Sequence, residues 1–166
     1  FLLPFEAVPG MSSAYAAWAA QGASFHYVSS SPWQLYEPLD AFRAKFGFPA
    51  GAFHLRSFRL SGSSILSLAK SPMETKPPRI RTILSRYPDH EFVLVGDSGE
   101  KDPEVYGLVA REHPEQIRHI FIRRVEGGEN TDPRFEAAFE RVPRTTWTVF
   151  SDPSVLRPAL AAPHTR

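Results

Sequence analysis

The chain has 166 residues, enough for one α/β domain with a substantial core. Lysine and arginine number 19 against 18 acidic residues, and the resulting net charge of +1 gives no reason to expect a nucleic-acid partner. The absence of cysteine excludes disulfides, zinc–cysteine sites and thiol catalysis, and no apolar run approaches the roughly 20 residues of a transmembrane helix.

Helix and strand signals alternate through the first third of the chain. Met11–Gln21 is rich in alanine and predicts a helix, and Ser24–Ser29 is aromatic and β-branched, which predicts a strand. Trp33–Phe46 has apolar residues at helical spacing, and Pro38 is expected to kink or divide this helix. Ala52–Phe58 alternates between apolar and polar residues and predicts a second strand.

The middle of the chain continues the alternation. The serine-rich segment Ser61–Ser71 predicts a mobile loop, and Pro78–Tyr87 predicts a helix. Phe92–Val95 is short and continuously apolar, which is typical of an interior strand of a parallel sheet. Pro103–Glu112 then predicts a covering helix and His119–Val125 a further strand.

The last part of the chain gives weaker signals. Pro133–Arg141 predicts a short helix, and Thr146–Phe150 predicts an edge strand or a packed extended segment. Residues Asp152–Arg166 are rich in proline and alanine and predict a poorly ordered tail. With no repeat and no linker, residues 1–166 predict one three-layer α/β/α domain with a Rossmann-like parallel sheet.

Two carboxylates follow the interior strand at Phe92–Val95. Asp97 comes directly after Gly96, at the carboxyl end of the strand, where open α/β sheets bind their ligands. Asp102 precedes Pro103 and is placed as the N-cap of the next helix. Both could face Mg²⁺, which takes one or two carboxylates together with water and phosphate oxygens. The alternative is that Asp97 only starts a turn and Asp102 only caps a helix.

Two further polar signals are expected at the same edge of the sheet. The segment Ser29–Ser31 closes the first strand, and the hydroxyl and N–H groups there, those of Ser29 and Ser30 among them, suit phosphate oxygens. Lys76, at the start of a helix, could bring a cation to the same place. Each signal has a plainer alternative, because serines before proline often form a turn and a lysine at a helix start usually faces solvent.

Together these signals resemble the haloacid dehalogenase (HAD) superfamily of phosphotransferases. Its second motif is a Ser or Thr that ends a strand, its third a Lys at a helix start and its fourth an acidic pair, GDxxxxD, and this chain has them in that order. Four stretches more closely resemble the catalytic domain of the actin-patch-type phosphatidate phosphatases. They are FHYVSSSPWQLY (Phe25–Tyr36), KPPRIRTIL (Lys76–Leu84), FVLVGDSGEKDPEVY (Phe92–Tyr106) and IFIRRV (Ile120–Val125).

The resemblance implies Mg²⁺-dependent removal of phosphate from phosphatidate, leaving diacylglycerol. It implies that Ser29 hydrogen-bonds a phosphoryl oxygen, with Ser30 beside it, and that Lys76 neutralises charge on the nucleophile and the phosphate. Asp97 would hold Mg²⁺, with Asp102 beside it. Such a protein is expected in the cytoplasm, with peripheral contact to a membrane.

One motif of the superfamily is missing from the chain. The motif DxDxT supplies the aspartate nucleophile, but no two aspartates here are separated by a single residue. They stand at positions 40, 89, 97, 102, 132 and 152. We therefore expect the chain to be an N-terminally truncated phosphatase domain, inactive as it stands. The alternative is a non-catalytic module that binds phosphate, lipid headgroups or a protein.

The missing motif has a structural counterpart. In this superfamily the strand that carries DxDxT lies in the middle of the sheet, between the strands that end at Ser29 and Gly96. Without it, two interior strands are expected to have unpaired backbone groups along facing edges. The sequence therefore predicts a chain that is unstable alone or that closes the gap by repacking.

Overall fold

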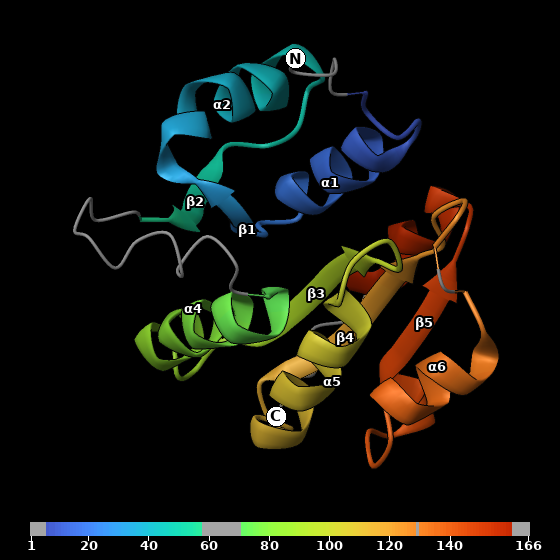
Figure 1. Ribbon diagram of the computed structural model, residues 1–166. Helices are drawn as coiled ribbons and strands as arrows, with labels where there is room; N and C mark the ends of the chain where they lie inside the picture. Colours follow the sequence, from blue (N-terminus) through green and yellow to red (C-terminus); the bar gives the residue numbers. More distant parts are fainter. Residues whose placement is uncertain (1–5, 58–70, 129, 161–166) are drawn as a thin grey trace. The chain divides into compact units, whose positions relative to one another are not determined.

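The computed structural model describes residues 6–57, 71–128 and 130–160, with side chains up to Leu156 in the last range. The chain forms two compact units, one of residues 1–58 and 152–166 and the other of residues 59–151 (Figure 1). In both units helices alternate with strands, and every described strand pair is parallel. The predicted α/β Rossmann-like class is therefore confirmed. The loop predicted over Ser61–Ser71 lies, except for Ser71, outside the described residues.

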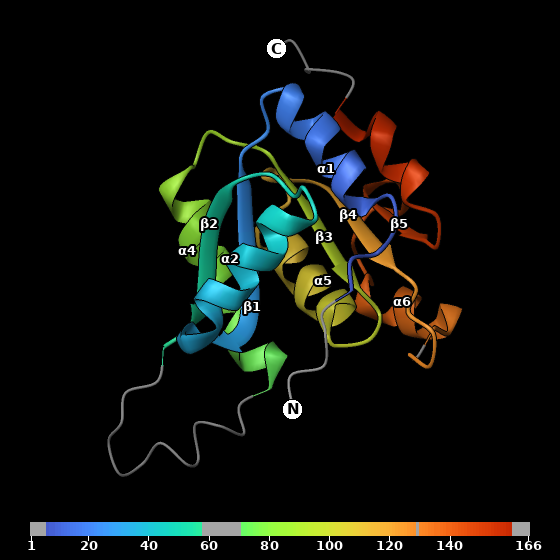
Figure 2. The same ribbon diagram turned by 90° about the horizontal axis from the view of Figure 1, so that it is seen from above.

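The first unit is built on a two-stranded sheet in which β1 and β2 run side by side (Figure 2). Its elements in chain order are α1 (Met11–Ala20), β1 (Phe25–Pro32), the 3₁₀ helix η1 (Trp33–Leu35), α2 (Tyr36–Lys45), β2 (Gly51–Arg56) and the 3₁₀ helix η3 (Pro153–Leu160). The helix predicted over Trp33–Phe46 is thus divided at Tyr36. Pro38 lies in the first turn of α2, where its missing N–H costs no hydrogen bond.

Aromatic side chains hold the first unit together. The ring of Tyr15 on α1 lies 5.5 Å from that of Phe25 on β1 and 5.6 Å from that of Phe48, between ring centroids. Burial raises the pKa of the Tyr15 hydroxyl well above its ordinary value. Such clusters contribute through the apolar area they bury and through their stacked and edge-to-face geometry.

The segment predicted as a frayed tail has a defined structure over Pro153–Leu160. Leu156 is fully buried, and its carbonyl oxygen accepts a hydrogen bond of 2.9 Å from Nε1 of Trp18 on α1. Pro153–Leu160 differs from the prediction because the buried side chain of Leu156 and its hydrogen bond with Trp18 hold this segment against α1, a contact that proline content does not reveal.

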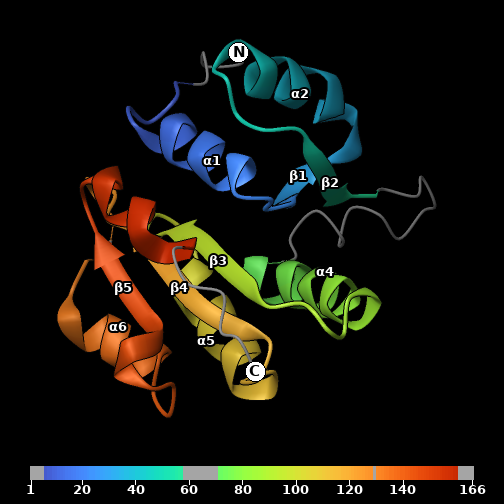
Figure 3. The same ribbon diagram turned by 180° about the vertical axis from the view of Figure 1, so that it is seen from behind.

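The second unit contains a three-stranded parallel sheet in the order β3-β4-β5. Its elements are α4 (Pro72–Arg86), β3 (Phe92–Asp97), α5 (Asp102–Glu112), β4 (Ile117–Arg123), α6 (Asp132–Ala138), the 3₁₀ helix η2 (Arg144–Thr146) and β5 (Trp147–Phe150). Helices α5 and α6 cover one face of this sheet (Figure 3). The central strand β4 supplies the core, with Ile120 and Ile122 fully buried.

Helix α4 begins six residues earlier than Pro78, the start that the sequence predicts. The carboxylate of Glu74 accepts a hydrogen bond of 2.9 Å from the N–H of Ser71, which satisfies a backbone group at the helix start. Lys76 consequently lies in the second turn of α4, where its side chain is buried. The capping residues, which the sequence interpretation did not use, decide this boundary.

The strands that were predicted to flank a missing central strand belong to different sheets. β1 pairs only with β2, and β3 is an edge strand of the second sheet, among the residues described. The edge of β1 that faces away from β2, and the edge of β3 that faces away from β4, thus have no strand partner among the described residues. The expected instability of the chain stays a prediction.

Candidate active site

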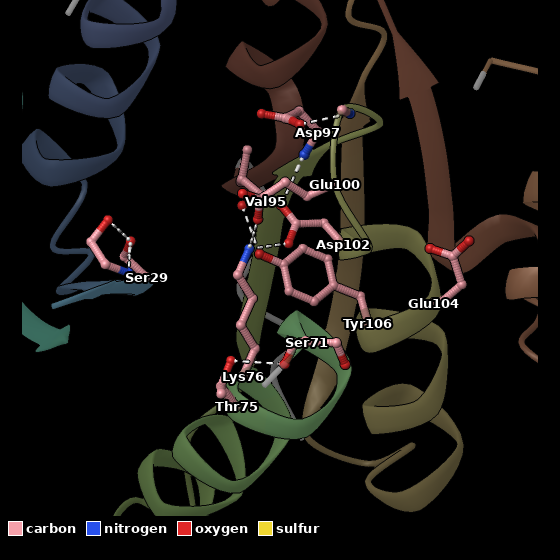
Figure 4. Close-up of polar contacts among 12 residues, drawn as sticks. Ser29, Ser71, Thr75, Lys76, Val95, Asp97, Glu100, Asp102, Glu104 and Tyr106 are labelled. Atoms are coloured by element: carbon pink, nitrogen blue, oxygen red, sulfur yellow. Dashed lines mark hydrogen bonds and ion pairs between the residues drawn. The ribbon is translucent and has the colours of Figure 1, made fainter. Parts of the chain in front are cut away.

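The centre of the candidate site is an ion pair between α4 and α5. Nζ of Lys76 donates a hydrogen bond to Oδ1 of Asp102, and the two side chains are only 8% and 9% exposed (Figure 4). Oε2 of Glu100 lies 3.2 Å from the same nitrogen, although the Glu100 side chain is 58% exposed. The ammonium therefore faces two carboxylates, of which one is buried.

The second oxygen of Asp102 connects this pair to the end of β3. Oδ2 accepts a hydrogen bond of 3.1 Å from the N–H of Asp97. Gly96 makes this approach possible, since a Cβ atom there would lie 2.7 Å from Cβ of Asp102 and 2.7 Å from the ring of Tyr106. Tyr106 donates from its hydroxyl to the carbonyl of Val95 at 3.0 Å, which fixes α5 against β3. The absence of a side chain at position 96 is thus a requirement of the site.

Asp97 ends β3 and has the more accessible carboxylate. Its Oδ1 accepts a hydrogen bond of 2.8 Å from the N–H of Gly99, as in a turn that an aspartate side chain begins. No described residue donates to its Oδ2. Asp97 therefore starts a turn, and whether it also binds a metal stays a prediction.

The buried pair shifts the pKa values of both its members. Burial by itself would lower the pKa of Lys76, but the charge and hydrogen bond of Asp102, with those of Glu100, raise this pKa above its ordinary value. Burial raises the pKa of Asp102, and the charge and hydrogen bond of Lys76 oppose that shift. Lys76 is accordingly a cation at neutral pH, paired with the carboxylates of Asp102 and Glu100.

The oxygens at the end of β3 fit a hard divalent cation. Among the described residues no three His, Cys, Asp or Glu side chains form a group that could hold a metal ion. Mg²⁺ does not require one, because it binds through one or two carboxylates and takes its other oxygens from water and phosphate. Oδ2 of Asp97 has no donor among the residues that the structure describes, whereas both oxygens of Asp102 accept hydrogen bonds. The chemistry of the pair suits Mg²⁺, with Asp97 the better placed ligand.

The structure brings Lys76, Asp97 and Asp102 together but does not test their relation to the serines, which belong to the first unit. Oγ of Ser29 donates to Oγ of Ser31 at 3.0 Å and accepts from its N–H at 3.1 Å. The regular pairing of β1 with β2 is interrupted between Val28 and Pro32, so that Ser29 and Ser30 lie in an irregular part of the strand. Irregular strand ends of this kind often adjoin active sites. Convergence of Ser29 with Lys76 stays a prediction.

Two residues of the site were not predicted from the sequence. Glu100 lies between Asp97 and Asp102 in the sequence, but only the structure places its carboxylate beside Lys76. Arg134 on α6 donates to the backbone carbonyls of Ser98 and Glu100, at 2.8 and 2.6 Å. No local signal marks Arg134, because its partners lie more than thirty residues away in the sequence.

A model of the protein family described as phosphatidate phosphatase APP1, catalytic domain, matches residues 3–124. The chain belongs to this family. The match includes Ser29, Lys76, Asp97 and Asp102, and it confirms the resemblance to the actin-patch-type phosphatases.

Two curated relatives support membership of the APP1 catalytic-domain family. Phosphatidate phosphatase APP1 of Saccharomyces cerevisiae is 38% identical over 99 residues, which are 60% of this chain and 16% of that protein. An uncharacterized protein of Schizosaccharomyces pombe is 32% identical over 121 residues, which are 72% of this chain and 20% of that protein. The chain thus spans a fifth or less of the length of these relatives. No solved structure matches the chain.

Proposed function

We propose that this chain is part of a Mg²⁺-dependent phosphatase that removes the phosphate of phosphatidate and leaves diacylglycerol. One observation carries the proposal: in a member of the APP1 catalytic-domain family, a buried lysine and two aspartates meet at the carboxyl end of a parallel strand. Phosphoryl transfer is catalysed mainly by positioning and by stabilising charge on the equatorial oxygens. A cation and a carboxylate pair at a strand end suit that task.

Each residue of the cluster has a proposed role. Asp97 would hold Mg²⁺, which when bound would polarise a phosphoryl oxygen and neutralise its charge. Lys76 would balance charge on the phosphate, and Asp102 would hold the Lys76 ammonium in place while it fixes the backbone at Asp97. The hydroxyls of Ser29 and Ser30 would donate hydrogen bonds to the phosphate.

The covalent step would require an aspartate that this sequence lacks. No DxDxT occurs in the 166 residues, so we propose that this chain does not turn over substrate by itself. The same observation favours a second candidate function, a module that binds a phosphorylated headgroup or a partner protein without hydrolysing it.

The proposed substrate is a lipid, so the reaction would take place at a membrane surface. No helix in the described ranges is long and apolar enough to cross a membrane. We propose peripheral contact with the membrane, reached from the cytoplasm.

The test measures phosphate release from phosphatidate in mixed micelles by the full-length gene product, with and without Mg²⁺. Asp97→Asn should lower Mg²⁺-dependent release on the order of 100-fold, since it removes the charge of the proposed ligand. Asp89→Asn is the matched control, because Asp89 is an exposed aspartate outside the site and its replacement should leave release unchanged.

The possible results separate the two functions. If Asp97→Asn released phosphate like the unmodified protein, the metal assignment would be wrong. If the gene product bound phosphatidate but released no phosphate at any Mg²⁺ concentration, it would be a binding module.

A further inference from the structure

Arg134 on α6 binds the loop that joins the two aspartates of the candidate site. Its Nε and Nη2 donate to the two carboxylate oxygens of Glu104, at 2.9 and 3.0 Å. Its Nη1 also donates to the carbonyl of Ser98 at 2.8 Å, and Nη2 to the carbonyl of Glu100 at 2.6 Å. The Arg134 side chain is only 7% exposed. A single guanidinium thus connects α6 with the loop and with α5.

The loop is held at its beginning as well. The N–H of Ser98 donates to the carbonyl of Arg123 at 2.9 Å, and Oγ of Ser98 accepts from the N–H of Val125 at 2.9 Å. The same hydroxyl donates to Oδ1 of Asn130. Ser98 therefore anchors the segment after β3, and Arg134 holds the carbonyls of Ser98 and Glu100.

Arginine is suited to this role for a physical reason. Its planar group has five N–H donors in a fixed fork, so that it can bind a carboxylate with two hydrogen bonds and still reach backbone carbonyls. Lysine has a single ammonium and cannot reproduce the fork. Without Arg134 the carbonyls of Ser98 and Glu100 would each lose a hydrogen bond. The carboxylate of Glu104 would lose two, so the loop from Asp97 to Asp102 would be held less firmly against α5 and α6.

We propose that Arg134 is a positioning residue that fixes this loop and thereby sets how Asp97 is presented to a divalent cation. The proposal rests on the proposed function, which makes Asp97 a ligand of Mg²⁺. It adds a residue outside the region that the family model matches, which ends at residue 124. Arg134 touches neither metal nor phosphate in this role.

The test measures binding of Mg²⁺ to the full-length gene product by isothermal titration calorimetry, without substrate. Arg134→Gln should weaken Mg²⁺ binding about 10- to 100-fold, as loss of a residue that orients metal ligands does. Arg134→Lys should not restore it, because the ammonium lacks the fork. Amide hydrogen exchange at Gly99, whose N–H is bonded to Asp97, should become faster in both variants without Mg²⁺.

Two control variants separate positioning from general stability. Glu104→Gln weakens the ion pair but leaves the two carbonyl contacts, and it should change Mg²⁺ affinity by less than about 3-fold. Arg111→Gln removes an arginine that donates to the carbonyls of Ala138 and Glu140, away from the loop, and it should leave the affinity unchanged.

The outcomes for the inference and for the proposed function are distinct. If Asp97→Asn abolished Mg²⁺ binding while Arg134→Gln bound Mg²⁺ like the unmodified protein, the inference would fail alone. Equal weakening by Arg134→Gln and Arg111→Gln would also overturn it. If Asp97→Asn left binding unchanged, the proposed function would fail, and the exchange rate at Gly99 would still decide whether Arg134 fixes the loop. If Arg134→Gln did not fold, Arg134→Lys would be judged by the same two measurements.

Discussion

Replacing Lys76 by methionine tests whether the buried ion pair is organised as the structure has it. Lys76→Met keeps the length and much of the apolar surface of the side chain but removes its charge. Asp102 is 9% exposed, so its carboxylate would be left in the interior without a counter-ion. Removing one partner of a buried pair costs about 3–5 kcal/mol of unfolding free energy.

Most of this loss should come from Asp102. Glu100 also contacts the ammonium, but its side chain is 58% exposed and water can replace the contact. An exposed pair contributes about 0–1 kcal/mol. Because the whole stability of a domain is about 5–15 kcal/mol, the substitution should remove a large part of it.

The double variant Lys76→Met/Asp102→Asn isolates the interaction. An asparagine at 102 is neutral and can still accept the hydrogen bond from the N–H of Asp97. The double variant should therefore be more stable than the sum of the two single changes predicts, by about 2–3 kcal/mol. Arg81→Met is the control, because it breaks an ion pair with Glu112 whose side chains are 42% and 34% exposed.

Urea unfolding followed by tryptophan fluorescence measures these differences. Trp147 is buried in the same unit as the pair, so its fluorescence reports on the unfolding of that unit. The reasoning would be refuted if Lys76→Met cost no more than Arg81→Met, or if the effects at 76 and 102 simply added.

Two further predictions concern other parts of the chain. Leu156→Ala should lower the free energy of unfolding by about 2–5 kcal/mol, because Leu156 is fully buried. Val155→Ala is the control and should change stability little, because Val155 is 41% exposed. Equal effects of the two changes in thermal unfolding would contradict the packing of η3. Burial, with the charge of Arg118, lowers the pKa of His119 in the folded chain. Its contribution to the free energy of unfolding should therefore be fully present above the ordinary pKa of about 6.5 and should be lost as the pH falls below that value. His119→Gln should make that decrease in unfolding free energy smaller, and an unchanged pH profile would contradict it.

Sequence patterns predicted most of the helices and strands because these depend on neighbouring residues. The apolar run at Phe92–Val95 and the alternation at Ala52–Phe58 each identified a strand, and no end of either strand moves by more than two residues in the structure. The start of α4 was missed, since it depends on the contact between Ser71 and Glu74. The order of motifs identified Lys76, Asp97 and Asp102, which the structure brings together.

Tertiary structure decided what each of these residues contacts. Asp102 was predicted to be the N-cap of α5, yet it is the first residue of that helix and binds Lys76, 26 residues earlier in the chain. Its place beside a metal stays a prediction. The contact between Arg134 and Glu104 joins residues 30 positions apart. No periodicity or cap encodes such pairs, because they depend on which faces of α4, α5 and α6 pack together.

The amino-acid sequence by itself determined the α/β class, the family and the carboxylates that follow β3, since apolar periodicity and short motifs are local properties. Only the folded chain decided that Lys76 is buried against Asp102, that Asp97 accepts a hydrogen bond from the N–H of Gly99 and that Arg134 holds the loop between the two aspartates. The physical reason is that burial and the pairing of charges arise when distant segments pack, and both then set the chemistry of each side chain.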